Sequence, residues 1–498
     1  MPENIRVLIV ILVLATGLFV MARSTVGAIA APGEFARRRN LWLALTLVAF
    51  LSYSFWIYVL IALPLLFYAS RRESNPAALF FFLLFVLPIA FVPIPGMGLI
   101  KQVFGLSHAR LLELIILLPA FFSLRKQGDS LPFGRTWPDK LLAAYLLLTV
   151  MLHLREPSLT DTMRFAFYQF IDVFLPYFVI SRALKNLQDF RDALLSLVLA
   201  IMVLAPLAVF ETVKHWLLYS SLTERLALEG GMTQYLGRDE MLRAITTAGH
   251  PIALGYLMVV GLGLYLYLQP RQQNKLLRRL GMAVLLAGLI APLSRGPWVG
   301  AVVLLLVYIS TGRYAARQWL TMTVAALLVL PSVSMLPGGD RVINLLPFIG
   351  TTEKANVEYR ENLLSNSLVV IQRNLLFGSN EYLETSEMKS MRQGQGIIDI
   401  VNTYILIALE SGIVGLALFA GFFALTLQGI YRAMRAVSAR DSEEYLLGRV
   451  LLSTLLAILV IIFTVSSITI IPVVYWSVAA LGVAYVQMVG RNAERSLR

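Results

Sequence analysis

Apolar runs separated by short polar connectors recur from one end of the chain to the other. Most of these runs approach the roughly 17–25 residues that an α-helix needs to cross a bilayer. The run at 41–69 is too long for one ordinary span, so it is either a tilted helix or a short hairpin. We therefore predict an all-α polytopic membrane protein with about 12–15 transmembrane helices and one large extracytoplasmic loop. The predicted spans are 7–22, 41–69, 77–95, 110–124, 140–153, 165–181, 194–218, 251–269, 280–294, 297–311, 318–336, 400–427, 449–465 and 468–489.

The composition agrees with this class of protein. Of the 498 residues, 58% are hydrophobic and 14% are charged, which leaves too few polar side chains to cover a soluble protein of this size. A β-barrel would instead contain short segments of alternating polarity. Because the chain contains no cysteine, disulfides, thiolate metal sites and cysteine nucleophiles are excluded.

The net charge of +13 is concentrated in the short connectors between apolar runs. This distribution is typical of cytoplasmic loops that orient membrane spans, and it requires no nucleic-acid partner. The connector at 428–448 and the C-terminal tail are basic, so we expect both to be cytoplasmic. Counting spans backwards from the tail then places the loops at 219–249 and 337–399 outside the membrane.

The spans and loops divide the chain into four regions. Residues 1–239 contain the N-terminal transmembrane helices, with an outer loop near 219–249, and residues 240–336 contain further transmembrane helices and a Ser-Arg-Gly sequence. Residues 337–399 form the large periplasmic loop, whose middle has a helical pattern closed by Gly378. Residues 400–498 contain the C-terminal transmembrane helices and the cytoplasmic tail. Loops as long as 337–399 in a compact bundle are usually functional.

Arg295 lies between two predicted spans, in the sequence Ser294-Arg295-Gly296-Pro297-Trp298. An arginine in this position often only reaches the membrane surface beside an aromatic residue. The alternative is a phosphate ligand, because a guanidinium stays charged in an apolar site and presents a planar fork to two oxygens. Gly296 and Pro297 would start a new helix beside the anion, and a helix N-terminus adds partial positive charge.

Other polar residues stand near the outer ends of spans. Arg243 and His250 bracket the entry to the span that begins near Pro251, and Tyr359-Arg360 lies in the large loop. Each could also be a surface residue without a functional role, since solvated arginines and hydrogen-bonded interfacial histidines are common.

A second group of polar residues surrounds the start of the span at 400–427. Asp399, Asn402 and Tyr404 stand at its entrance, and Glu410 lies two turns inside it. Polar groups at such depths cost free energy unless they have partners or a task. Glu211, inside an earlier apolar run, raises the same question.

Together these segments resemble the signature of the O-antigen ligase and polymerase superfamily, bacterial membrane enzymes that transfer lipid-linked glycans. The family pattern has an arginine after a serine in a span connector, an aromatic-arginine pair in the large loop, a turn like NPLFGxG, and HNxYLxxLxExGxxGL entering the next span. The segment RAITTAGHPIALGY also looks like a family segment before an earlier span. The resemblance covers about residues 240–425, and the matching positions are Arg295, Arg360, Phe377-Gly378, Asn402, Tyr404, Glu410, Gly412 and Gly415.

The resemblance implies a substrate and a reaction. The donor is expected to be an undecaprenyl-pyrophosphate-linked glycan at the outer face of the bacterial inner membrane, with Arg295, Arg360 and Arg243 holding the pyrophosphate. An acceptor sugar hydroxyl attacks the anomeric carbon and the lipid pyrophosphate leaves. Because this leaving group is already activated, we expect no cofactor and no metal. The bilayer is a further partner, and a chain-length regulator and a flippase of the same pathway are candidates.

One departure from the family pattern concerns the catalytic base. Ligases have a histidine before the Asn-x-Tyr sequence, where this chain has Val401, and no histidine occurs in 337–399. We therefore consider Asp399 as the base, with Asn402 beside it, and His250, Tyr359, Tyr404 and Glu410 as supporting residues. The missing histidine favours a polymerase of O-antigen or exopolysaccharide repeat units. The alternatives are an O-antigen ligase acting on lipid A-core and, from another class, a lipid-linked oligosaccharide flippase.

Overall fold

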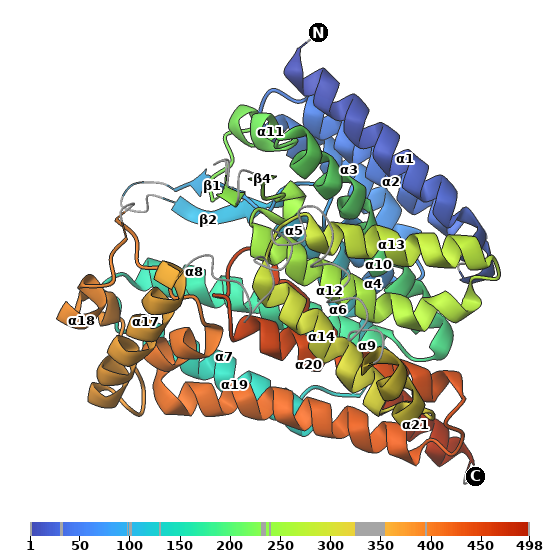
Figure 1. Cartoon of the computed structure of the whole chain (residues 1–498). Coiled ribbons are helices and arrows are strands. Elements are labelled where there is room, and N and C mark those ends of the chain that lie inside the picture. Colours follow the sequence, from blue (N-terminus) through green and yellow to red (C-terminus); the bar gives the residue numbers. More distant parts are fainter. Residues whose placement is uncertain are drawn as a thin grey trace.

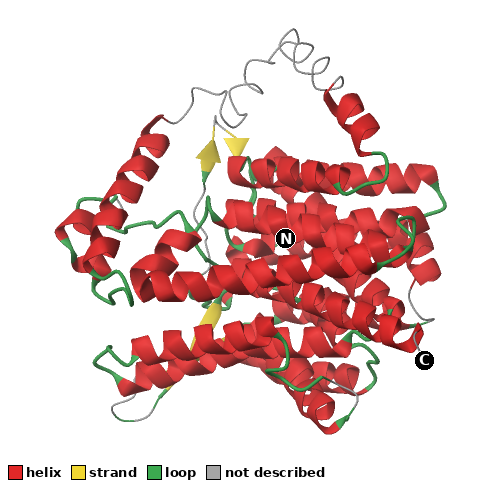
Figure 2. Cartoon of the chain, turned by 90° about the horizontal axis from the view of Figure 1, so that it is seen from below, coloured by secondary structure: helices red, strands yellow, loops and turns green. Residues whose placement is uncertain are grey.

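The computed structural model describes residues 2–29, 33–96, 98, 102–128, 131–230, 236–238, 241–323, 354–393 and 396–496. Most of the long helices run in one general direction and form a single bundle (Figure 1, Figure 2). Seven helical stretches in these ranges are long and apolar enough to cross a membrane, which confirms an all-α polytopic membrane protein. They are Glu3–Gly27, Leu159–Ala183, Leu187–Lys214, Pro251–Arg271, Thr403–Ala436, Glu443–Ile462 and Ile471–Glu494.

The first part of the chain supplies helices that pack on both sides of the later ones, α10 on α12 and α13, and α7 and α9 on α19 and α21, and a short antiparallel sheet of β1 and β2. Two of its helices contain π-helical turns, η1 and η2, which lie in contact with each other. Its elements are α1 (Glu3–Ile29), α2 (Glu34–Leu51), α3 (Phe55–Arg71), α4 (Pro76–Leu83), β1 (Phe91–Pro95), β2 (Gln102–Ser107), α5 (His108–Leu112), η1 (Glu113–Leu117), α6 (Leu118–Lys126), α7 (Trp137–His153), α8 (Leu159–Tyr168), η2 (Gln169–Phe174), α9 (Leu175–Ala183), α10 (Leu187–Lys214) and α11 (Ser220–Arg225).

The second part supplies the remaining spans and a group of helices at one end of the bundle, α17 and α18 (Figure 1). Its elements are β3 (Gly237–Arg238), β4 (Met241–Leu242), η3 (Thr246–Ala248), α12 (Pro251–Leu268), η4 (Gln269–Arg271), α13 (Lys275–Ile290), α14 (Arg295–Ser310), α17 (Lys354–Arg373), η5 (Tyr382–Glu384), α18 (Ser386–Lys389), α19 (Thr403–Ala436), α20 (Glu443–Ile462) and α21 (Ile471–Ser496).

Two predicted spans differ from a single helix. The run at 41–69 forms two packed helices, α2 and α3, which meet at a turn where Ser54 caps α3, so the hairpin interpretation is the correct one. The prediction of a span at 77–95 is wrong. There α4 ends at Leu83 and the chain continues into β1, because Pro88, Pro93 and Pro95 lack the N–H that a helix requires. Of the predicted span at 318–336, residues 324–336 lie outside the described part, as does 337–353 of the large loop.

Ionic contacts gather three connectors at one end of the bundle. The Glu443 carboxylate, at the start of α20, pairs with Arg191 of α10 and with Arg271 after α12. Arg313, which follows α14, pairs with Asp441 in the next connector. These connectors therefore share one end, as the parity of the predicted spans requires. At the opposite end α12, α14, α19 and α21 begin, and α10, α13 and α20 finish.

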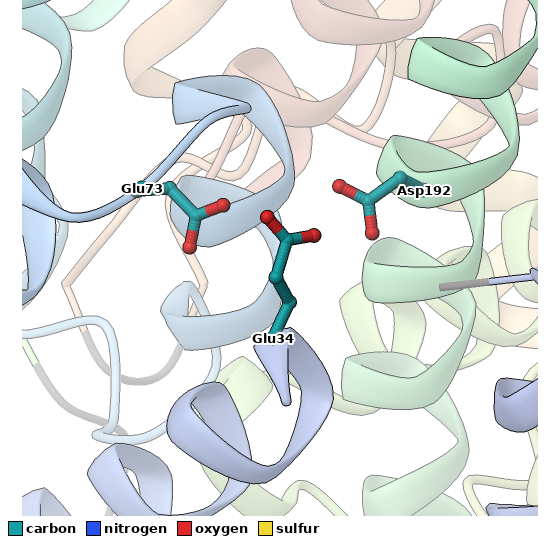
Figure 3. Close-up of side chains that lie close together, drawn as sticks. All are labelled: Glu34, Glu73 and Asp192. Atoms are coloured by element: carbon teal, nitrogen blue, oxygen red, sulfur yellow. The ribbon is translucent and has the colours of Figure 1, made fainter. Parts of the chain in front are cut away.

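A buried guanidinium joins the first helices to α10. Arg38 is 2% exposed and donates to both oxygens of Asp192, at 2.7 and 2.8 Å, and to Glu73 at 3.1 Å. Glu34 completes the group, and Figure 3 shows the three carboxyl groups pointing toward one another. These carboxylates could hold a cation by their spacing alone, but they bind the guanidinium of Arg38 instead. The cluster is therefore a structural ion-pair network.

The helix α19 is interrupted in its middle. Gly412 has φ 66° and ψ −167°, so the helix stops before this residue and restarts after it. The interrupted N–H groups are satisfied from outside the helix, because Ile413 donates to the Leu375 carbonyl at 2.8 Å and Val414 to that of Leu376 at 3.3 Å. Non-helical backbone at membrane depth is tolerated only where such partners exist.

The segment that fills this interruption is the turn around Gly378. Its φ is 61°, and a Cβ added to Gly378 would lie 2.4 Å from the Leu409 carbonyl oxygen. A Cβ on Gly412 would lie 2.3 Å from the Leu376 carbonyl. Arg155 holds the turn from the other side, donating to the carbonyls of Phe377 and Gly378 at 3.1 and 3.0 Å. The large loop is thus attached backbone to backbone to the broken helix.

We predict that Arg38→Ala destabilises the protein by about 3–5 kcal/mol, since it leaves buried carboxylates without their cation. The neighbouring Arg37 is a matched control, because it is exposed and its contact with Glu34 is 3.7 Å. Arg37→Ala should change stability by less than about 1 kcal/mol. Thermal unfolding in detergent measures both variants, and equal midpoints would contradict the structural role of Arg38.

We also predict that Gly412→Ala detaches the turn around Gly378. The positive φ alone costs alanine about 1–3 kcal/mol, and the added Cβ meets backbone that cannot move aside. Gly421→Ala, in a regular part of the same helix, meets only a side-chain methyl at 3.3 Å and should be neutral. Limited proteolysis near residues 375–378, together with the unfolding midpoint, measures the effect. A Gly412→Ala protein as resistant as Gly421→Ala would refute this attachment.

Candidate functional site

The turn that contains Arg295 connects α13 to α14. Leu293 has a positive φ of 48°, which reverses the chain, and Arg295 is the first residue of α14. Pro297 lies in the first turn of that helix, where its missing N–H has no helical partner to lose. Trp298 fastens the turn by donating from Nε1 to the Leu289 carbonyl at 3.0 Å. The half-buried Arg295 therefore stands at a helix N-terminus, as the sequence predicts.

Arg243 lies directly against this turn. Its Nε donates to the Pro292 carbonyl at 3.2 Å and its Nη2 donates to the Ser294 hydroxyl at 3.0 Å. These bonds place a second guanidinium beside the residue that precedes Arg295.

Glu211, near the end of α10, positions the segment that carries Arg243. Its buried carboxylate accepts from the backbone N–H groups of Ile245 and Thr246, both at 2.9 Å, and from Leu218 at 3.0 Å. Thr246 has a φ of 46°, a conformation that these bonds help to hold. The acidic residue inside an apolar run therefore has a structural task.

Thr464 joins this turn to the large loop. A Cβ on Gly296 would lie 2.4 Å from the Thr464 Oγ1, so the start of α14 packs closely on this residue. Arg360 of α17 donates from Nη2 to the Thr464 carbonyl at 3.4 Å. The structure thus brings the segment that begins with Arg295 and the helix that carries Arg360 together at one threonine, although they are far apart in the sequence.

Asp399 lies in the same region, ahead of α19. The Tyr359 hydroxyl donates to its carbonyl at 3.0 Å and accepts from its N–H at 3.2 Å, which fixes the backbone. Ser466 donates to the carboxylate at 3.4 Å. Burial raises the pKa of the Asp399 carboxyl above its ordinary value, whereas the Ser466 hydroxyl and the charge of Arg360 oppose the shift. A carboxylate with a raised pKa is a stronger proton acceptor than an exposed aspartate.

Asn402 and Tyr404 have identifiable structural contacts. The Asn402 Oδ1 caps α19 by accepting from the N–H groups of Tyr404 and Ile405, at 2.9 and 3.2 Å. The Tyr404 hydroxyl donates to the Leu459 carbonyl at 2.9 Å. Thr403 donates from its N–H and its hydroxyl to the Val465 carbonyl. The start of α19 is therefore held against the connector between α20 and α21.

A cavity of about 390 Å³, the α17 cavity, lies between α17, α19 and the end of α20. Most of its lining is apolar, and its polar members come from all three elements. Along α19 it extends from Asn402 to Leu416, beyond the helix interruption. Such a cavity suits an amphipathic molecule, with an apolar chain along α19 and an anionic group near Arg360. The lining residues are Val357, Arg360, Glu361, Leu363, Leu364, Leu368, Ile371, Val401, Asn402, Tyr404, Ile405, Ala408, Leu416, Phe463 and Thr464.

Two other predicted residues lie apart from this cavity. Glu410, at the interruption of α19, is exposed and lies beside the Tyr382 hydroxyl of η5. His250 caps α12, because its Nδ1 accepts from the Ile252 N–H at 3.1 Å. Burial and the charge of Arg243 lower the pKa of His250 to about 4, so its ring is neutral at physiological pH.

The sequence reasoning missed the connector between α20 and α21. Thr464 meets the two arginine-bearing segments, Ser466 contacts Asp399, and Ser467 donates to the Thr403 hydroxyl at 3.2 Å. A signal was available, since four of the six residues from Thr464 to Thr469 carry hydroxyl groups between two apolar runs.

Comparison with known proteins bears on the segment that holds most of this site. Residues 280–420 match the family model described as O-antigen ligase, and this range includes Arg295, Arg360, Asp399 and Asn402. No curated protein matches the chain. The match supports the resemblance to the O-antigen ligase/polymerase superfamily over residues 280–420, the segment that carries Arg295, Arg360 and Asp399.

Proposed function

We propose that this protein polymerises undecaprenyl-pyrophosphate-linked oligosaccharide repeat units, of O-antigen or exopolysaccharide, at the outer face of the inner membrane. The main support is the meeting of Arg360 and the Arg295 turn at Thr464, beside an apolar cavity along α19. In this proposal the end of the bundle that carries these residues faces the periplasm, and the basic connectors at the other end face the cytoplasm.

The donor would lie with its isoprenoid chain in the α17 cavity and its pyrophosphate near Arg360 and Arg295. Guanidinium groups suit this task because each can donate to two phosphate oxygens at once. The N-terminus of α14 adds partial positive charge beside Arg295. Arg243, bound to Ser294, would raise the positive potential of the same turn. These groups would stabilise the negative charge that grows on the pyrophosphate as it leaves.

The reaction would be a displacement at the anomeric carbon. The oxygen of an acceptor sugar hydroxyl forms the new glycosidic bond, the bond between carbon and pyrophosphate oxygen breaks, and the configuration inverts. The hydroxyl proton passes to the Asp399 carboxylate, which Tyr359 positions through two backbone hydrogen bonds. Holding the acceptor beside this carboxylate would supply a further part of the rate enhancement.

A ligase that transfers the finished glycan to lipid A-core is the second candidate. It is favoured by the description of the matching family, O-antigen ligase. The polymerase is preferred because Val401 stands where ligases have a histidine. A flippase would use the same lipid-linked glycan without breaking a bond, and it would leave the Asp399 carboxylate near Arg360 without a task.

We predict that Arg360→Ala and Arg295→Ala each lower the polymerisation rate by about 10²–10³-fold, the usual effect of removing one group that stabilises transition-state charge. Lysine at either position should rescue poorly, because it retains the charge but not the bidentate fork. Arg373→Ala is the matched control, since this arginine lies on the same helix as Arg360 but pairs with Glu387 away from the cavity. Polymer formed from purified lipid-linked repeat units measures the rate. Full activity in both alanine variants would exclude these arginines as pyrophosphate ligands.

We predict that Asp399→Asn lowers the rate by about 10²–10⁴-fold, the usual contribution of a general base, while the donor still binds. Because the base must be deprotonated and burial raises its pKa, activity of the native enzyme should fall with decreasing pH at a midpoint above the roughly 3.9 of an exposed aspartate. Rates measured across pH in native and Asp399→Asn protein test this. An unchanged rate in the variant would place the base elsewhere.

The same variant distinguishes the two candidate functions by its products. A polymerase without its base should accumulate single repeat units on the lipid carrier in cells. A ligase without its base should accumulate long glycan chains on the carrier. Analysis of lipid-linked glycans by size therefore separates them.

A further inference from the structure

A second apolar groove, the α10 groove, is lined by residues of α1, α10 and α13. It has a volume of about 410 Å³ and runs over α10, on which α1 and α13 both pack. Its lining is apolar except at one position, Lys214, the last residue of α10. The lining residues are Leu14, Ala205, Pro206, Val209, Phe210, Val213, Lys214, Val284 and Ala287.

The charged end of this groove lies at the end of the bundle that carries the candidate site. Lys214 is exposed where α10 finishes, and two residues later the Trp216 ring lies 5.9 Å below the guanidinium of Arg6. Aromatic rings and cations in this arrangement are typical of the membrane surface. Glu3 also contacts this ring, accepting from Trp216 Nε1 at 3.1 Å. The groove thus combines an apolar floor with one cation, Lys214, at its mouth, a combination that fits a lipid with an anionic head group.

The mouth of the groove is linked directly to the Arg295 turn. Thr212, on the last turn of α10, donates to the Ala291 carbonyl at 2.9 Å. Ala291 follows α13, which forms one wall of the groove, and comes shortly before Ser294 and Arg295. Glu211 holds the segment of Arg243 from the same turn of α10. The last turn of α10 thus contacts both the segment of Arg243 and the residues that lead to Arg295, whereas the α17 cavity reaches the Arg295 turn through Thr464.

We propose that the α10 groove binds the isoprenoid chain of a second lipid-linked glycan, the acceptor, while the α17 cavity binds the donor. This inference rests on the proposed function, because two lipid-linked substrates are needed only if one glycan is transferred to another that is also attached to a lipid. An ordinary phospholipid would also fit an apolar groove. The connection of the groove to the Arg243 and Arg295 segment favours the polyprenyl lipid, since its head group carries the reacting glycan.

The test counts bound lipids by native mass spectrometry of the full-length protein, with C55 polyprenyl pyrophosphate as the probe. Native protein should bind two equivalents. Val209→Trp, which fills the α10 groove, should bind one, and Ile405→Trp, which fills the α17 cavity, should also bind one. Val302→Trp is the matched control, because Val302 is 54% exposed on α14 and lines neither site. This control should still bind two.

Lys214→Glu provides a variant that leaves the packing unchanged. Reversal of this charge should weaken binding of the second lipid by about tenfold, as expected for basic residues near an anionic lipid head group. Two equivalents in Val209→Trp, or one in native protein, would overturn the inference. So would displacement of the second equivalent by phosphatidylglycerol at the same concentration as the probe, because the groove would then bind ordinary lipid.

Lipid counting does not depend on turnover, so it separates the two proposals. If the inference is correct, Val209→Trp retains one lipid and loses chain growth. If the proposed function fails, native protein forms no polymer from lipid-linked repeat units whatever number of lipids it binds.

Discussion

The contact between Gly412 and Gly378 is the constraint on which the arrangement of the site depends. The interruption of α19 leaves backbone N–H groups unsatisfied within a predicted membrane span, and the turn after α17 supplies the carbonyls that accept from them. A side chain at either glycine would separate the two backbones. Because α17 carries Arg360 and Tyr359, this contact at one end of the loop also fixes where these two side chains lie relative to α19.

The site is assembled from connectors rather than from a single motif. Four segments contribute, around Arg243, Arg295, Arg360 and Thr464, and hydrogen bonds or close packing link each to another. Buried or backbone-directed groups hold these segments, including Glu211 under Arg243 and Tyr359 beside Asp399. The large ion-pair cluster at Arg38 serves the scaffold instead. In the described chain, the ion pairs of Arg38 therefore stabilise the bundle, whereas Arg243 and Arg360 lie at the candidate site.

Sequence patterns predicted all seven helical stretches of the described chain that are long and apolar enough to cross a membrane, but not how the candidate residues near their ends meet. The helical pattern closed by Gly378 corresponds to α17 and the turn that follows it. It could be predicted because a helix and its terminating glycine depend on residues that are close in the sequence. The prediction of a span at 77–95 was wrong because this segment, although apolar throughout, contains three prolines that prevent a continuous helix. Thr464 was missed because its importance arises only from contacts with residues distant in the chain. A motif alone does not distinguish a structural role from a catalytic one. The side-chain oxygen of Asn402, for example, caps α19.

The directions of the helices have an electrostatic consequence. At the end of the bundle that holds the site, α12, α14, α19 and α21 begin whereas α10, α13 and α20 finish, so most of their backbone dipoles cancel across the bundle. The effect of a dipole is local, however, and the first turns of α14 and α19 each direct roughly half a positive elementary charge toward the residues beside Arg295 and Asn402. This potential belongs to peptide groups, so it does not titrate and no side-chain substitution removes it. An anion beside Arg295 would therefore meet a favourable potential that comes from the start of α14 itself.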